Sequence, residues 1–151
     1  MMGAAFLAGA LLLYGCAREV PRPLPAAADT VRGVLERVGS EPATWLVVRA
    51  SRDVRLVDGP PWLGTLTGTE VMVRGAPVPD GFRVDDVRVR AVDGEPAMDG
   101  VLAREGAGWV LTHDGRRLPV RLPAGLHARE GTRVWFVGQP PERFGVITEA
   151  P

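Results

Sequence analysis

Residues 131–138 read GTRVWFVG, and residues 68–75 read GTEVMVRG. Each stretch has a glycine at both ends and apolar residues at alternate positions between them. Alternation with a period of two is the signal of a half-buried β-strand, and the flanking glycines are typical of turns. Because the same pattern occurs twice, the two stretches give a register for aligning the rest of the chain. They predict a β protein built from two copies of one small unit.

The chain around each stretch carries the same residue types in the same order. The corresponding segments are 33–35 and 100–102, Trp45 and Trp109, 54–56 and 120–122, and 82–84 and 144–146. The spacing between equivalent residues shortens along the chain, which places the length differences in loops. So many matches in one order favour a duplicated unit over a chance similarity between two glycine- and valine-rich segments.

Alternating or β-branched runs predict five strands in each copy. The predicted strands cover residues 30–38, 44–50, 53–57, 69–74 and 82–92 in the first copy, and 98–105, 108–113, 118–122, 132–137 and 144–149 in the second. Asp-Gly pairs, a strong hairpin signal, separate several of them. One leucine in each copy, Leu63 or Leu126, lies between the third and fourth strands. The strand order resembles the OB-fold barrel, and this resemblance implies that the leucine plugs the bottom of the barrel.

Five strands with a capping segment between the third and fourth resemble the OB-fold barrel. The repeated glycine-flanked strand is also similar to the fourth strand of many small bacterial OB-like domains. The resemblance implies an all-β fold of two small five-stranded OB-like barrels in tandem, at residues 29–94 and 95–151. One continuous β-sandwich or barrel of about ten strands is the alternative.

The N-terminal residues 1–15, MMGAAFLAGALLLYG, are apolar almost throughout and precede the sole cysteine, Cys16. A membrane-spanning helix needs about 20 such residues, so this run has the length of a signal-peptide core. The sequence Leu13-Tyr14-Gly15-Cys16 resembles the lipobox of bacterial lipoproteins. The resemblance implies cleavage before Cys16 and attachment of lipid to its thiol. An uncleaved hydrophobic anchor is the alternative.

Residues 16–28 follow as a lipid-attached tether rich in proline and alanine, which is expected to be semi-extended. The membrane is therefore one predicted partner, through the N-terminal lipid. The predicted location is the bacterial envelope, after export, with the protein facing the periplasm. The sequence does not distinguish the inner from the outer membrane.

Acidic and basic residues are equal in number, at 18 each, so the net charge is zero. Nucleic-acid binding relies on a basic surface, so such a partner is disfavoured. A single cysteine excludes an intramolecular disulfide and a Cys-based zinc cluster. His113 and His127 lack the spacing of a metal motif, and we expect both in solvated loops. We therefore predict no metal, no cofactor and no catalytic site.

Charged residues crowd the predicted strand 82–92. Arg88 and Arg90 alternate with valines, so both are expected on one ion-paired, solvated strand face. Asp85 and Asp86 could form a pair of carboxylates, but strand charges are the simpler interpretation. This segment does not predict an active site.

Four large apolar residues are the candidate binding residues. Met72 and Trp135 hold equivalent outward positions on the fourth strands, and we expect a contact between the repeats or a partner surface there. Trp45 and Trp109 are also equivalent to each other. Equal positions in a repeat favour the same packing role, and stacking on a sugar or peptide is the alternative.

These observations predict a non-catalytic, lipid-anchored envelope protein that acts as a binding or assembly module for another envelope component, either a protein or a glycan. Binding of a small periplasmic ligand or saccharide through an OB-like face is the alternative. A nucleic-acid-binding role is a remote alternative that returns only if the export prediction is wrong.

Overall fold

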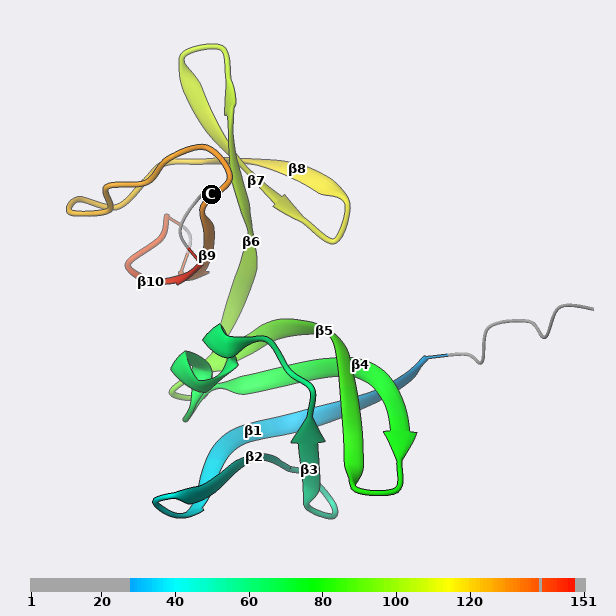
Figure 1. Cartoon of the computed structure of the whole chain (residues 1–151). Helices are drawn as coiled ribbons and strands as arrows, with labels where there is room; N and C mark the ends of the chain where they lie inside the picture. The colour runs from blue at the N-terminus through cyan, green and yellow to red at the C-terminus, as the bar shows by residue number, and fades with distance from the viewer. Residues whose placement is uncertain (1–27, 139, 149–151) are drawn as a thin grey trace, which may run out of the picture.

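The computed structural model describes residues 28–138 and 140–148 (Figure 1). This part of the chain is all-β, as predicted, with one short 3-10 helix, η1. The first repeat contains β1 (Asp29–Ser40), β2 (Ala43–Arg49), β3 (Val54–Val57), η1 (Pro61–Leu66), β4 (Glu70–Val78) and β5 (Gly81–Val92). The second contains β6 (Glu95–Glu105), β7 (Gly108–His113), β8 (Arg116–Val120), β9 (Arg133–Val137) and β10 (Arg143–Thr148). All the predicted strands are present, with ends that differ by a few residues.

The strands of the first repeat form a closed ring of hydrogen bonds. β1 pairs with β2 and with β4, β2 pairs with β3, and β4 pairs with β5, all in antiparallel orientation. A short parallel pairing of β3 with β5, Leu56 with Phe82 and Val57 with Arg83, completes the ring. The first repeat is therefore a small five-stranded barrel.

The second repeat has the same neighbours but an open ring. Its strand order is β8-β7-β6-β9-β10, and within the described residues β8 pairs only with β7. Pro123 takes the place of Val57, and a proline has no N–H for a strand ladder. Pro119 within β8 has the same effect, which is tolerated at a sheet edge. Pro123 therefore lacks a donor next to Leu122, where the first repeat closes its ring through Leu56 and Val57.

The two repeats join into one continuous hydrogen-bonded sheet, which is a feature of the alternative fold. Ala91 and Val92 at the end of β5 pair with Pro96 and Glu95 at the start of β6. In Figure 1 β6 rises from the first repeat into the second and links the two groups of strands. The fold is thus two five-stranded units within a single ten-stranded sheet.

The Gly-Thr turn before the fourth strand makes the same backbone bonds in both repeats. The N–H of Leu35 donates to the carbonyl of Thr69 at 2.9 Å, and its carbonyl accepts from Gly68 at 2.8 Å. Leu102 makes the equivalent two bonds, at the same lengths, with the Gly-Thr turn before β9. The repeated Gly-Thr sequence therefore has the same structural role in both copies. Each turn holds the fourth strand, β4 or β9, to the first strand of its own repeat, β1 or β6.

The two predicted plug leucines, Leu63 and Leu126, are both buried. Each lies in the hydrophobic cluster of its own repeat. Each also closes the same local turn, in which its N–H donates to the carbonyl of a proline: Pro60 at 3.0 Å and Pro123 at 3.2 Å. The connector is helical only in the first repeat, as η1.

Gly75 differs from the sequence-based expectation of a turn. It lies inside β4, at a shift of register with β5, and the strand continues to Val78. A Cβ at this position would overlap the carbonyl oxygen of Arg83, so glycine permits a close approach of the two strands. Gly138, its equivalent, does form a turn, with φ of 87°.

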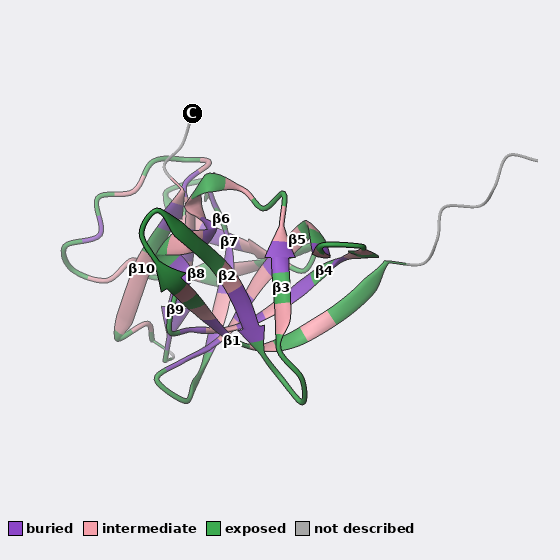
Figure 2. Cartoon of the chain, turned by 60° about the horizontal axis from the view of Figure 1, so that its bottom comes forward, coloured by how far each residue is buried: buried purple, intermediate pink, exposed green. Residues whose placement is uncertain are grey.

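The hydrophobic core of the first repeat extends into the second. Ala97, Val137 and Ile147 of the second repeat belong to the first cluster, which therefore crosses the boundary. Figure 2 shows buried segments in both groups of strands, whereas the start of β1 and most loops are exposed. Repeats of this size bury little surface alone, so the shared cluster adds apolar burial that neither has by itself.

Candidate functional sites

The two outward residues of the repeated strand, Met72 and Trp135, are held by different contacts. Trp135 is half-buried and packs against the first cluster, at the contact between the repeats. Gly145 on β10 makes room for its indole ring, because a Cβ there would overlap the ring. Met72 is also half-buried, and its Sδ lies 3.6 Å from an Nη of Arg90. Val71 and Val73, on either side of Met72, are fully buried.

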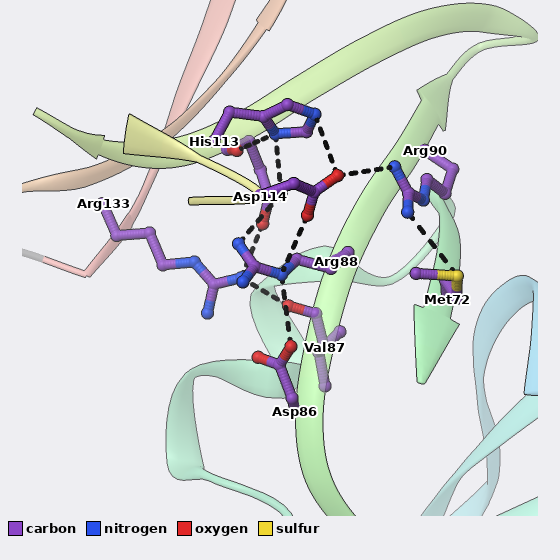
Figure 3. Close-up of polar contacts among 9 residues, drawn as sticks. Met72, Asp86, Val87, Arg88, Arg90, His113, Asp114 and Arg133 are labelled. Atoms are coloured by element: carbon purple, nitrogen blue, oxygen red, sulfur yellow. Dashed lines mark hydrogen bonds and ion pairs between the residues drawn. The ribbon is translucent and has the colours of Figure 1, made fainter. Parts of the chain in front are cut away.

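A buried carboxylate is the centre of the polar contact between the repeats (Figure 3). The side chain of Asp99 on β6 is 0% exposed, and its Oδ2 accepts a hydrogen bond from Arg133 at 2.5 Å. Arg133 on β9 also donates to the backbone carbonyl of Val87 on β5. This arginine therefore bonds both repeats at once, and burial makes such a charged pair costly to break from one side.

His113, at the end of β7, contributes to the same polar contact. Its Nδ1 lies 2.6 Å from the backbone carbonyl of Asp99, and because a carbonyl only accepts, this nitrogen donates. Its Nε2 lies 3.3 Å from a carboxylate oxygen of Asp114. Asp114 in turn lies 3.8 Å from Arg88 and 3.7 Å from Arg90. The side chain of His113 is only 16% exposed, so the expectation of a solvated loop histidine is wrong.

We call this set of side chains the junction cluster: Asp86, Arg88, Arg90, Asp99, His113, Asp114 and Arg133. Its members come from β5 in the first repeat and from β6, β7, β9 and the β7–β8 turn in the second. Figure 3 labels all of them except Asp99. Each charged group in it bonds or faces an oppositely charged or polar group, but one carboxylate oxygen has no hydrogen bond. The Oδ1 of Asp99 has no hydrogen-bond partner and lies 4.0 Å from Arg88 and from His113.

The pair at the centre of the junction cluster has a charge-reversed equivalent in the first repeat. The sequence alignment matches Asp99 with Arg32 and Arg133 with Glu70. Nε of Arg32 donates to Glu70 at 2.6 Å, so the same two positions form an ion pair with the charges exchanged. The pair in the first repeat is exposed, at 64% and 32%, whereas the second is covered by β5. The sequence carried this signal, but the alignment by itself did not show which pair is buried.

Trp45 and Trp109 do not play the same part, although they align. Trp109 is half-buried, packs against the second cluster and lies 4.3 Å below the guanidinium of Arg104. Trp45 is 37% exposed, and the guanidinium of Arg55 lies farther from its ring, at 5.3 Å. Sequence equivalence therefore predicts the position of each ring but not its burial.

The exposed ring of Trp45 forms one wall of a groove of about 380 Å³, which we call the Trp45 groove. β2, β3 and the connector that leads into η1 supply its lining. The lining residues are Thr44, Trp45, Leu46, Arg55, Leu56, Val57, Asp58, Gly59, Pro60 and Leu63. Leu56 and Leu63 are core residues, so they form an apolar base, and Arg55 and Asp58 are exposed.

The remaining candidate residues have simple environments. Asp85 lies 3.7 Å from Arg83, and Asp86 lies 3.2 Å from Arg88, so both act as ion-paired strand charges, as predicted. His127 is exposed in the loop before β9, as predicted. Cys16, the predicted lipid site, lies outside the described residues.

Two features are absent from the part of the chain that the structure describes. No group of three His, Cys, Asp or Glu side chains is placed to hold a metal ion there. Within residues 28–138 and 140–148, no helix has the length and apolar character needed to cross a bilayer.

Comparison of the chain with protein-family models, with curated proteins and with solved structures finds no match.

Proposed function

We propose that this chain is a non-catalytic, lipid-anchored protein of the bacterial envelope that acts as a binding or assembly module. The observation that carries the proposal is what the buried polar side chains contact. The side chains best suited to acid-base chemistry, Asp99 and His113, bond groups of their own repeat, within the cluster of charged side chains at the contact between the repeats. We infer a scaffold whose remaining surfaces can bind a partner.

The position of the first strand supports the anchor. β1 begins at Asp29, directly after the predicted tether of residues 16–28. A tether of this length and composition would hold the barrel close to a membrane while leaving it room to meet a partner. Several acyl chains on Cys16 would anchor it stably, because each buried CH₂ contributes about 0.8 kcal/mol.

We also infer that each repeat is an OB-type unit. Five strands form the ring of the first repeat, and a capping segment with a buried leucine lies between its third and fourth strands. This arrangement agrees with the five-stranded, partly open barrel of that fold. The second repeat keeps the strand neighbours and the capping leucine.

Binding of a small ligand or saccharide is the second candidate. The Trp45 groove favours it, because an exposed aromatic ring there borders a concave site. Nucleic acid stays disfavoured, since the acidic and basic residues balance.

The test of the anchor is the intact mass of the protein in the membrane fraction, with the Cys16→Ser variant beside it. We expect the wild-type chain to begin at residue 16 with added acyl mass, and the variant to lose the lipid and leave the membrane. A wild-type chain that keeps residues 1–15 and carries no lipid would refute the anchor and return nucleic acid to consideration.

The test of the binding role uses the same two proteins in detergent. Affinity capture from an envelope extract should retain one component in stoichiometric amount on both, because the repeats bind and the lipid only positions them. If neither protein retains such a component, the assembly proposal fails, even where acylation is found.

A further inference from the structure

We propose that the Trp45 groove is a binding site for a neutral saccharide. The inference rests on the proposal that the chain is a binding module, but it does not depend on the lipid anchor. It depends only on β2, β3 and the connector to η1, which supply the ring, the polar groups and the apolar base.

The aromatic wall is the first argument. Trp45 is one of only a few large apolar side chains that the structure leaves exposed. A tryptophan combines a broad apolar face with an indole N–H that donates a hydrogen bond. A pyranose ring with equatorial substituents has the matching form, a flat C–H face bordered by hydroxyl groups. The indole and the sugar therefore complement each other in shape and in polarity.

The polar groups at the rim are the second argument. Arg55, Asp58 and Thr44 line the groove, and all three are exposed. Among the described residues neither Arg55 nor Asp58 has an ion-pair partner, unlike most of the charges on the neighbouring strands. A carboxylate accepts hydrogen bonds and a guanidinium donates them. Together with the Thr44 hydroxyl, they match the mixed donors and acceptors of vicinal sugar hydroxyls.

The balance of charge decides between ligand classes. Arg55 and Asp58 give the groove one positive and one negative charge. A nucleic acid or another polyanion would place its charges near the carboxylate of Asp58, where like charges repel. A neutral saccharide uses both groups without leaving an uncompensated charge. The groove volume of about 380 Å³ lies at the lower end of the range for small-molecule sites, which suits a short segment of a sugar chain.

The contact between Arg55 and Trp45 does not close the site. The guanidinium lies 5.3 Å from the ring centroid, and cation–π contacts at exposed positions are weak. A stacked sugar ring would displace Arg55 sideways and accept its hydrogen bonds. Trp109 offers no comparable surface, because it is half-buried and Arg104 lies closer, at 4.3 Å. Trp109 therefore serves as a control, because it aligns with Trp45 but its ring is covered.

The experiment titrates the full chain with two neutral probes, cellotetraose and chitotetraose, in a detergent that has no sugar headgroup. Calorimetry measures the affinity, and NMR follows the four indole N–H signals. We expect saturable binding of at least one probe at millimolar or lower concentration, with the Trp45 signal shifted most. Trp45→Ala should weaken binding by about tenfold or more, and Asp58→Asn by roughly tenfold.

Trp109→Phe should leave the affinity unchanged within about twofold, and the circular dichroism of each variant checks that it folds. The proposal is overturned if neither sugar binds, or if binding survives in Trp45→Ala. It is also overturned if an oligothymidylate or an oligoglutamate binds with the same dependence on Trp45. Acylation of Cys16 is read separately by mass, so a failed anchor and a failed sugar site give different results.

Discussion

Replacing Arg133 with methionine tests whether the buried ion pair holds the junction cluster together. The side chain of Asp99 is 0% exposed and that of Arg133 only 15%. Removing one partner of a buried pair typically costs about 3–5 kcal/mol, because the other charge stays buried without compensation. Arg88 lies 4.0 Å from the second carboxylate oxygen and compensates part of that charge. We therefore expect Arg133→Met to lower the free energy of unfolding by about 3 kcal/mol, the lower end of that range.

The matched control is Arg32→Met in the first repeat. Arg32 forms the charge-reversed pair with Glu70 at the equivalent positions, and its side chain is 64% exposed. Exposed ion pairs contribute about 0.2–1 kcal/mol, because water screens them. The two variants remove the same side chain from equivalent pairs. They differ in burial and in the bond that Arg133 also makes to the carbonyl of Val87. We expect their losses of stability to differ by about 2 kcal/mol.

A double variant separates the unpaired charge from the lost contacts. Asp99→Leu combined with Arg133→Met removes both charges, so no buried carboxylate is left alone. Replacing a buried pair by apolar residues is often nearly neutral, and we expect the double variant to be more stable than Arg133→Met alone. Asp99→Leu alone completes the double-mutant cycle, and its coupling energy should be about 2 kcal/mol, within the range found for contacting residues.

Urea unfolding of the full chain is the assay, followed by circular dichroism and by tryptophan fluorescence. Urea is preferred to guanidinium chloride because salt would screen the exposed Arg32 pair. Coincident curves from the two probes justify a two-state free energy. The reasoning is refuted if Arg133→Met and Arg32→Met cost the same within about 0.5 kcal/mol. It is also refuted if the double variant is the least stable of the three.

The other predictions concern stability and use the same urea assay. Gly33→Ala and Gly100→Ala each place a Cβ on a carbonyl oxygen of the neighbouring strand, so each should lower the free energy of unfolding by about 1–3 kcal/mol. At Gly108 an added Cβ makes no contact closer than ordinary van der Waals distance, so Gly108→Ala should be neutral within about 0.5 kcal/mol. Equal stability of all three glycine variants would contradict the proposed close approach of the strands. Leu63→Ala and Leu126→Ala should each lower the free energy of unfolding by about 2–5 kcal/mol. The loss should be larger at Leu63, because it is less exposed than Leu126. The reverse order would contradict the plug assignment.

Local signals in the sequence predicted the strands because they depend on neighbours along the chain. Alternating residues gave the ten strands, and Asp-Gly pairs marked turns in which Asp58, Asp93 and Asp114 have positive φ. The repeated Gly-Thr motif gave the alignment of the two copies, and the backbone bonds of Leu35 and Leu102 repeat with it. These features need no knowledge of how distant segments pack.

The candidate sites depend on contacts between distant segments, and prediction was weaker there. Asp99 lies in a predicted strand, but its burial results from β5 of the other repeat, which no periodicity shows. His113 precedes a turn and looked solvated, yet the same packing covers it. The open second ring did leave a readable signal, since Pro119 and Pro123 cannot donate to a strand ladder. Weighing those prolines against the alignment would have predicted an open edge.

The exchanged charges also indicate which repeat meets the partner. In the second repeat the outward face of the first and fourth strands carries Asp99, Arg133 and Trp135, and it is used up in the contact with the first repeat. The equivalent face of the first repeat carries Arg32, which is 64% exposed, so none of the described residues covers it in this way. The same asymmetry separates Trp45 from Trp109. The face that carries Arg32 and the Trp45 groove both belong to the repeat next to the predicted tether. We therefore expect substitutions that block partner binding to cluster in residues 29–94. Substitutions in the second repeat should act mainly by lowering stability.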